Sequence, residues 1–320
     1  MNSALVLGVN GQDGSYLAEI LSERGVTVTG VGRQPASRWV DPGRIHYVQM
    51  DVADAGALDA LLVSAMPEQI YHMAALHGPA GSVYESNWRD ALQLNVASVH
   101  TCLEHIRRRS PATRLFCPSS LKAFGSQPPA EIDESTPRVG SCLYSITKNA
   151  ATDLIHYYQR SHSCWACVGY YFNHDSPRRP ETYFLPRLVA QVSASLRQAL
   201  DAPRVESLDF WCDWGSSREF MEITIDLLKL DAPQDLIVAT GRPVYAADLA
   251  GELFERLGGV VPALPSRNRN TPPVRARLEA LHRTVGRLPR YGAMDVAEWI
   301  LSEHYGLVLP RPEKGVSIQS

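Results

Sequence analysis

Tyr144 and Lys148 are the residues whose types and spacing most directly indicate proton transfer. They stand one helical turn apart in a stretch, residues 144–162, that has the pattern of a long helix, so both side chains share a face. An ammonium beside a phenol favours the phenolate and lowers the tyrosine pKa. Ser120 ends a predicted strand and could hydrogen-bond the reacting oxygen. The alternative is a surface pair without a catalytic role.

A glycine-rich turn near the N-terminus indicates phosphate binding. Gly8, Gly11 and Gly14 form G-x-x-G-x-x-G between a predicted strand and a predicted helix. Glycine permits a tight turn and a close backbone approach, so the helix amides can meet a pyrophosphate. We therefore predict a dinucleotide cofactor bound by these glycines with Gln12 and Asp13; the alternative is a plain turn.

The end of the second predicted strand selects the cofactor. An acidic residue there favours NAD, whereas a basic one accepts the 2′-phosphate of NADP. This sequence has Arg33 there, which favours NADP and leaves NAD possible; a solvated arginine is the alternative. We also assign Asp51 and Ala74 to the cofactor site, because each follows or ends a predicted strand, although Asp51 could instead cap a turn with Asp54.

Strand patterns alternate with helix patterns, which predicts an α/β fold with a doubly wound parallel (Rossmann) sheet. Predicted strands cover residues 4–7, 26–32, 45–50, 69–75, 113–120, 164–172 and 236–241. Predicted helices cover residues 15–24, 55–65, 87–108, 144–162, 184–200, 219–230, 246–257 and 293–304. We assign 1–172 to the dinucleotide-binding domain, with return segments at about 205–258, and 173–204 and 259–320 to a smaller, discontinuous substrate domain.

Composition excludes several classes of function. A net charge of −3 does not favour binding to nucleic acid, and no apolar run is long enough to cross a membrane. The 6 cysteines lie in mostly apolar settings, which predicts reduced thiols in a cytoplasmic protein and no metal site. Of the histidines, His72 reads as a core residue and His174 as a structural one, while His77 stays open.

With these motifs, the sequence resembles the extended short-chain dehydrogenase/reductases, and among them the GDP-mannose 4,6-dehydratases. The resemblance covers about residues 3–258 and rests on four segments: GVNGQDGSYLAE from Gly8, YSITK from Tyr144, FNHDSPRRPET from Phe172, and DWG from Asp213 with IVATG from Ile237. In that family a hydride leaves the sugar C4 for NADP⁺, water leaves across C5–C6, and the hydride returns to C6.

The resemblance also implies roles for individual residues. Tyr144 would be the base at O4, supported by Ser120 and Lys148. Asn173 and Arg187 match positions that contact the nucleotide sugar. Arg178, with its neighbour Arg179, would bind phosphate or hold the loop by ion pairing. The loop from 33 to 44 resembles the family's oligomer-forming segment, which implies a homodimer or homotetramer.

Two positions depart from the family. The glutamate that serves the elimination is replaced by Lys122, two residues after Ser120, and a protonated lysine cannot take the C5 proton. Trp211 and Cys212 stand where the family has an arginine for the pyrophosphate. The sequence therefore predicts an NADP-dependent enzyme acting at C4 of a nucleotide-linked sugar, with Lys122 in the catalytic set. The alternatives are a 4-keto reductase, 4-dehydrogenase or epimerase without dehydration, or a non-catalytic nucleotide-binding homologue.

Overall fold

The computed structural model describes residues 2–78, 82–198, 208–258 and 272–309. A seven-stranded sheet runs through it in the order β11-β7-β5-β4-β1-β2-β3, and all its pairs are parallel. The strands are β1 (Ser3–Leu7), β2 (Thr27–Gly32), β3 (His46–Gln49), β4 (Gln69–His72), β5 (Arg114–Ser120), β7 (Ala166–Tyr171) and β11 (Leu236–Val238). The predicted doubly wound fold is confirmed, and each predicted sheet strand is present with ends shifted by a few residues.

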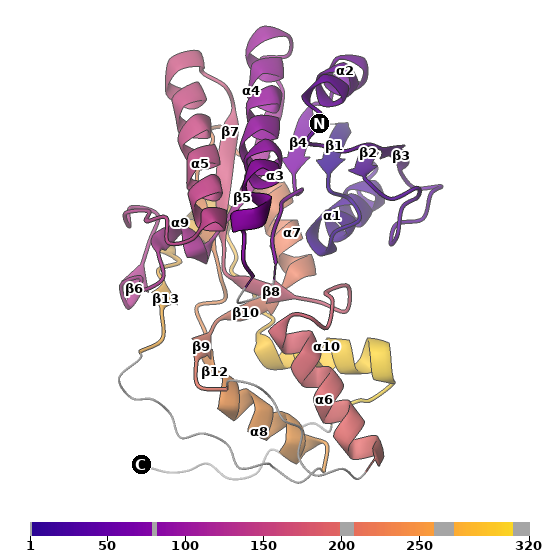
Figure 1. Cartoon of the computed structure of the whole chain (residues 1–320), viewed down its shortest axis with the longest axis vertical. Coiled ribbons are helices and arrows are strands. Elements are labelled where there is room, and N and C mark those ends of the chain that lie inside the picture. Colours follow the sequence, from indigo (N-terminus) through magenta and orange to yellow (C-terminus); the bar gives the residue numbers. More distant parts are fainter. Residues whose placement is uncertain (1, 79–81, 199–207, 259–271, 310–320) are drawn as a thin grey trace.

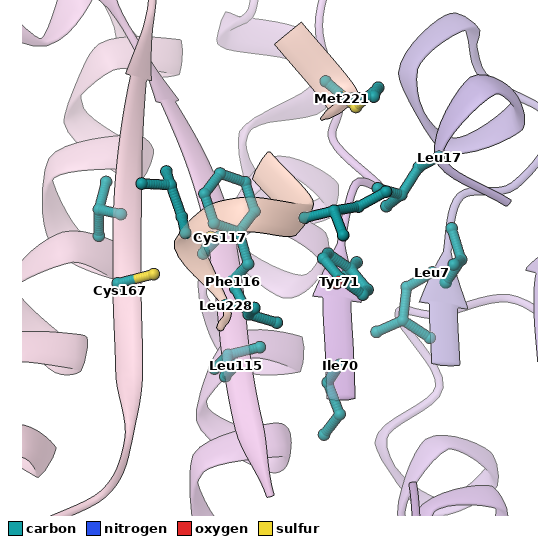
Figure 2. Close-up of a cluster of buried hydrophobic side chains, with 14 of the residues drawn as sticks. Leu7, Leu17, Ile70, Tyr71, Leu115, Phe116, Cys117, Cys167, Met221 and Leu228 are labelled. Atoms are coloured by element: carbon teal, nitrogen blue, oxygen red, sulfur yellow. The ribbon is translucent and has the colours of Figure 1, made fainter. Parts of the chain in front are cut away.

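Helices cover the sheet in two layers. One contains α1 (Gln12–Glu23) packed on α7 (Ser217–Leu227); the other contains α2 (Ala55–Ala65), α4 (Ser98–Arg108) and α5 (Leu143–His162) (Figure 1). Figure 2 shows the buried contact between the first layer and the sheet, where Leu17 and Met221 face Tyr71 and Phe116. These side chains are almost fully buried, and their burial fixes the strand ends that carry the site.

The predicted helix 87–108 is divided into segments. A short 3-10 turn, η1 (Glu85–Asn87), leads to α3 (Trp88–Leu92), a π-helical turn, η2 (Gln93–Ala97), and then α4. The π turn contains Asn95, which is buried and bonds outside its own helix. One residue is thus inserted into the helical repeat where a polar side chain must point at a neighbouring element.

A second apolar cluster lies beyond the carboxyl ends of the strands. It is built by α6 (Phe184–Gln198), α8 (Ala246–Arg256) and α10 (Ala293–Tyr305), with the paired strands β9 (Trp211–Cys212) and β12 (Val244–Tyr245) (Figure 1). We expected the helix at 246–257 to cover the sheet, but α8 belongs to this cluster because its apolar face packs on α6 and α10.

The helix α9 (Glu279–Val285) lies in the segment that we assigned to the substrate domain, but it packs in the sheet cluster. It comes late in the chain, yet it packs on α7 and β11 in the sheet cluster, beside the small pair of β13 (Arg275–Ala276) and β6 (Glu131–Ile132). We therefore propose that the domain boundaries follow the two clusters rather than the continuous segments read from the sequence. Parts of those segments, 199–207, 259–271 and 310–320, lie outside the described residues.

Between the two clusters lies the segment on which the site depends. The strand β8 (Asn173–Asp175) pairs in parallel with β10 (Trp214–Ser216) at the sheet's carboxyl edge. Asp213, just before β10, is buried and accepts hydrogen bonds from Thr240 and from the Gly241 amide, at 2.7 Å for the latter. The Asp213 carboxylate therefore connects the segment before β10 to the segment that follows β11.

Candidate functional site

The glycine turn between β1 and α1 has no room for side chains. Gly8 has φ +89°, and a Cβ there would lie 2.7 Å from the Ala74 nitrogen. A Cβ on Gly14 would lie 2.3 Å from the Gly8 carbonyl oxygen. The backbone of α1 therefore approaches the ends of β1 and β4 as closely as a chain can, and the space above it suits a pyrophosphate on the helix N-terminus.

A cavity of about 260 Å³ opens beside this turn. Gly8, Gly11, Arg33, Asp51 and Ala74 line it together. The structure thus gathers residues that we assigned to the dinucleotide, and Arg33 is exposed at the rim of the cavity. An arginine at the end of the second strand is the residue type that accommodates a 2′-phosphate in this class of fold.

Gln12 and Asp13 connect α1 to β8. The Asp13 carboxylate accepts hydrogen bonds from His174 at 3.0 Å and from Ser217 at 2.8 Å. Burial opposes its ionisation, but His174 and the other donors hold the pKa of Asp13 well below its ordinary value. Burial alone would lower the pKa of His174, yet Asp13 raises it. Gln12 donates to the His174 carbonyl at 3.2 Å. Both side chains line the larger cavity described next, so they fix its wall as well as the turn.

A larger cavity, of about 510 Å³, continues from the first one, with which it shares Gly11, Met73 and Ala75. It is lined by the residues that we expected to be catalytic, Ser120, Lys122, Tyr144 and Lys148, and by Asn173, which we expected to contact the substrate. Ser120 ends β5, Tyr144 and Lys148 lie on the first turns of α5, and Asn173 opens β8. Three separate elements therefore meet at one cavity, at the carboxyl edge of the sheet where ligands bind in this class of fold.

Burial has the largest effect on the pKa values of Tyr144 and Lys148. Burial, followed by the neighbouring Tyr84, raises the pKa of Tyr144, and Arg179 is the cation that opposes the rise. Burial also lowers the pKa of Lys148, whose ammonium donates to the Pro118 carbonyl at 2.9 Å. Lys148 is bonded to β5 in this structure and is not among the groups that act most on the pKa of this phenol, so its predicted effect on Tyr144 stays a prediction.

The arginines of the 178–187 segment take different places. Arg178 is directed away from the cavity: it donates to Glu19 at 2.6 Å and to Ser15 at 2.9 Å, and it stacks on Tyr16. Of the two roles given to Arg178, holding the loop by ion pairing is the one seen: Arg178 connects the loop after β8 to α1, and its assignment to substrate is corrected. Arg179 lines the cavity instead, with its Nε 3.2 Å from Asp175. Arg187 lies half-buried on α6, outside the lining of that cavity.

Asn95 is a positioning residue that the sequence did not reveal. Its side chain accepts from the Leu76 amide at 2.9 Å and donates to Thr147 at 3.0 Å. Thr147 lies between Tyr144 and Lys148 on α5, so Asn95 ties the end of β4 to the helix that carries both. The signal would have been a polar residue inside an apolar helical face, which the assumed regular helix concealed.

His77 and Tyr183 also enter the cavity without having been assigned to it. The His77 ring lies 4.9 Å from the Tyr144 ring, and its Nδ1 is 3.1 Å from the Tyr183 hydroxyl. Although part of the imidazole is open to solvent, its surroundings in the cleft and the nearby cations Arg179 and Lys122 lower the pKa of His77 to about 3. A neutral imidazole therefore stands beside the reacting phenol.

The residues at the second departure from the family pattern form the strand β9. Burial raises the pKa of the Cys212 thiol, and the nearby Asn173 side chain opposes that rise. Trp211 packs on Tyr245 of the second cluster, with ring centroids 5.4 Å apart. Among the described residues, no three His, Cys, Asp or Glu side chains gather to hold a metal, and no described helix is long and apolar enough to cross a membrane.

Comparison with known proteins finds the same likeness along most of the chain. The family model for GDP-mannose 4,6 dehydratase matches residues 5–276. The GDP-mannose 4,6-dehydratase of Yersinia enterocolitica is 30% identical over 263 residues, which cover 76% of this chain and 69% of that protein. The GDP-mannose 4,6 dehydratase 2 of Caenorhabditis elegans is 28% identical over 280 residues, or 80% of this chain and 70% of that one.

Solved structures share the whole fold at lower identity. A UDP-glucose 4-epimerase from Thermotoga maritima, solved with UDP-glucose, has a TM-score of 0.77 and 18% identity over 93% of this chain and 98% of that one. A dTDP-glucose 4,6-dehydratase from Bacillus anthracis, solved with NAD, has a TM-score of 0.76 and 15% identity over 95% and 98%. At these identities the likeness establishes the architecture, including the second cluster beyond the sheet.

Proposed function

The chain belongs to the GDP-mannose 4,6-dehydratase family, and we propose that it exchanges a hydride at C4 of a nucleotide-linked sugar with NADP as its cofactor. The observation that carries this proposal is the continuity of the two cavities. The smaller one is lined by the glycine turn and Arg33, and the larger one by Ser120, Tyr144 and Lys148. A dinucleotide laid along the turn would place its nicotinamide end beside the phenol.

Each polar group then has a defined task at the sugar. Tyr144 takes the proton from the C4 hydroxyl, or returns it to a C4 ketone, and Ser120 hydrogen-bonds the same oxygen. Lys148, buried one turn along α5, moves from the Pro118 carbonyl toward the phenol and stabilises the phenolate. When bound, the nicotinamide supplies the acceptor or donor of the C4 hydride.

We propose that water is not eliminated in this reaction. Lys122 occupies the position of the family's glutamate, and a lysine ammonium has no lone pair with which to remove the C5 proton. In the described part of the chain, the carboxylates that line the larger cavity are Asp13 and Asp175, each already facing a cation. Oxidation or reduction at C4, as in a 4-dehydrogenase, 4-keto reductase or epimerase, needs no such base.

Product analysis tests this function. The purified enzyme is incubated with NADP⁺ or NADPH and with GDP-mannose, UDP-glucose or their 4-keto forms, and the sugar is followed by NMR. We expect a change at C4 with the C6 substituent retained. A 4-keto-6-deoxy product would contradict the absence of dehydration. Tyr144→Phe should lower turnover by roughly 10²- to 10⁴-fold, the usual contribution of a general acid or base.

The alternative of a non-catalytic homologue is separated by the same measurement. Tight NADP binding without turnover of any nucleotide sugar would favour it over an enzyme. We also propose a cytoplasmic location for this chain, supported by the 6 cysteines, all of which are free thiols.

A further inference from the structure

The larger cavity carries an excess of positive charge. Asp13 and Asp175 are the carboxylates among its described lining residues, and each is committed to a cation: His174 lies 3.0 Å from Asp13, and Arg179 lies 3.2 Å from Asp175. Lys122 also lines the cavity, and the described residues provide it with no carboxylate within ion-pair distance. An ammonium left without a counter-ion in a cleft favours an anionic ligand.

The position of Lys122 restricts which part of the ligand can carry the negative charge. It lies in the 3-10 turn Leu121–Phe124, whose start is fixed by a 3.2 Å bond from the Lys122 amide to the Ser120 hydroxyl. Its Nζ is 6.0 Å from the centre of the Tyr144 ring. Ser120 and Tyr144 both address the oxygen on C4 in the proposed reaction. The ammonium therefore reaches the substituents of the carbons next to C4.

His77 also lies beside Tyr144, and the positive charges of this cavity act on it as well. Its imidazole is kept neutral by its surroundings in the cleft and by the charges of Arg179 and Lys122. The part of this effect that comes from Arg179 and Lys122 is a positive potential, and a positive potential favours a negative group in the same space. The neutral ring, with Nδ1 bonded to Tyr183, retains a second nitrogen that can donate to or accept from a ligand.

Among the groups next to C4 of a hexopyranose, the exocyclic C6 is the carbon that can be a carboxylate while the ring stays closed. Resting on the hydride exchange proposed above, we propose that the substrate is a nucleotide-linked hexuronic acid and that Lys122 binds its C6 carboxylate. Lys122 is then a specificity residue: its Nζ pairs with the carboxylate while Tyr144 and Ser120 hold the C4 oxygen.

Paired substrates test this assignment. The wild-type enzyme with NADP⁺ is given UDP-glucuronate and UDP-glucose, and GDP-mannuronate and GDP-mannose. We expect kcat/KM to be higher for the uronate of at least one pair. Lys122→Met should lower kcat/KM for that uronate by roughly 10- to 100-fold, the usual range for a charge-assisted hydrogen bond, and lower it less for the paired neutral sugar, so that the ratio of the two kcat/KM values falls. Lys229→Met, an exposed lysine of α7's end, is the matched control and should change neither.

A binding measurement gives a readout besides turnover. Tyr144→Phe protein, with and without Lys122→Met, is titrated with each nucleotide sugar by calorimetry. The uronate should lose affinity on removal of Lys122, and the neutral sugar should not. Equal losses for both sugars would show that Lys122 binds the diphosphate common to them, and would overturn the proposal.

The remaining outcomes separate the uronate proposal from the proposed hydride exchange at C4 on which it rests. Turnover of the neutral sugar but not of the uronate would overturn the carboxylate assignment and leave hydride exchange at C4 standing. Failure of all four sugars to bind or react would overturn the nucleotide-sugar function, and the uronate assignment with it.

Discussion

Arg33 is the side chain that should separate the two nicotinamide dinucleotides. It lies exposed at the rim of the smaller cavity, after β2. An arginine there pairs with a 2′-phosphate, and an aspartate would instead accept from a free 2′-hydroxyl. We expect Arg33→Asp to weaken NADP binding by roughly 10- to 100-fold and to strengthen NAD binding. Fluorescence titration with both cofactors measures this, and Arg283→Asp, exposed on α9, controls for the change of charge. A wild type that prefers NAD would refute the assignment.

The residues of the site differ in how far the sequence could predict them. Tyr144 and Lys148 were accessible because one helical turn is a local spacing that survives folding. Arg178 and Arg179 were not, since two adjacent side chains point opposite ways and only the course of the loop decides which enters the cavity. His77 meets Tyr183 across 106 positions, a contact that no local pattern contains.

At the scale of elements, the turn between β1 and α1 makes a steric prediction. Gly14→Ala would place a methyl group 2.3 Å from the Gly8 carbonyl oxygen, so α1 must move away from the strand end. We expect a loss of about 1–3 kcal/mol in the free energy of unfolding and weaker dinucleotide binding. Gly56→Ala, in α2, is the matched control because its methyl group would meet Asp54 at an ordinary 3.5 Å. Denaturant titration and cofactor-binding measurements on the two variants test this prediction. Equal stability and equal cofactor affinity of the two variants would contradict a tight turn.

His72, in the central strand β4, leads to a prediction about stability at low pH. Burial and, next, the Lys148 ammonium lower the pKa of His72 from 6.5 to about 4. The folded protein favours the neutral imidazole. The contribution of His72 to the free energy of unfolding is therefore complete above pH 6.5 and is lost as the pH falls toward 4. Relative to His72→Gln, which can still reach Ser98, the wild type should lose about 3 kcal/mol of unfolding free energy over that interval. Chemical unfolding at several pH values measures the difference, with the exposed His282→Gln as control.

The elements also show what periodicity can and cannot predict. Alternating strand and helix patterns gave the sheet, because each parallel strand is buried on both faces and reads as an apolar run. The helix at 87–108 was expected to be continuous because we read it with a regular helical period, whereas the π turn directs Asn95 toward Thr147. The helix α8 has an apolar face that fits either cluster, and its sequence does not say which one it covers.

At the scale of the whole molecule, the site lies between two cores that form from interleaved parts of the chain. The sheet core takes in α9 from late in the sequence, and the second core takes in α6, α8 and α10. The cavity is lined by both, through Tyr171 and Phe172 of the sheet core on one side and Phe184 and Trp214 of the second core on the other. Any change in how the two cores approach therefore alters the distance between the sugar and the phenol.

The outer face of α5 leads to a prediction about assembly. Ile146 and Tyr157 keep 42% and 51% of their surface exposed, although both are large and apolar. They stand eleven positions apart, about three turns or roughly 16 Å, and so lie on one face of the helix. Large apolar side chains exposed on one face of a helix are typical of an interface, and we expect this face to pair with the same face of a second chain about a twofold axis.

Light scattering tests this assembly. We expect the wild type to have the mass of two or four chains, and Tyr157→Lys to shift the mass toward one chain, because it places two ammonium groups close together across the twofold axis. Tyr291→Lys, at a tyrosine with 48% exposure just before α10, is the matched control and should keep the wild-type mass. A monomeric wild type, or a Tyr157→Lys protein of unchanged mass, would exclude this face. Because Tyr144 and Lys148 lie on the opposite side of the same helix, loss of pairing should also lower turnover without changing which cofactor is bound.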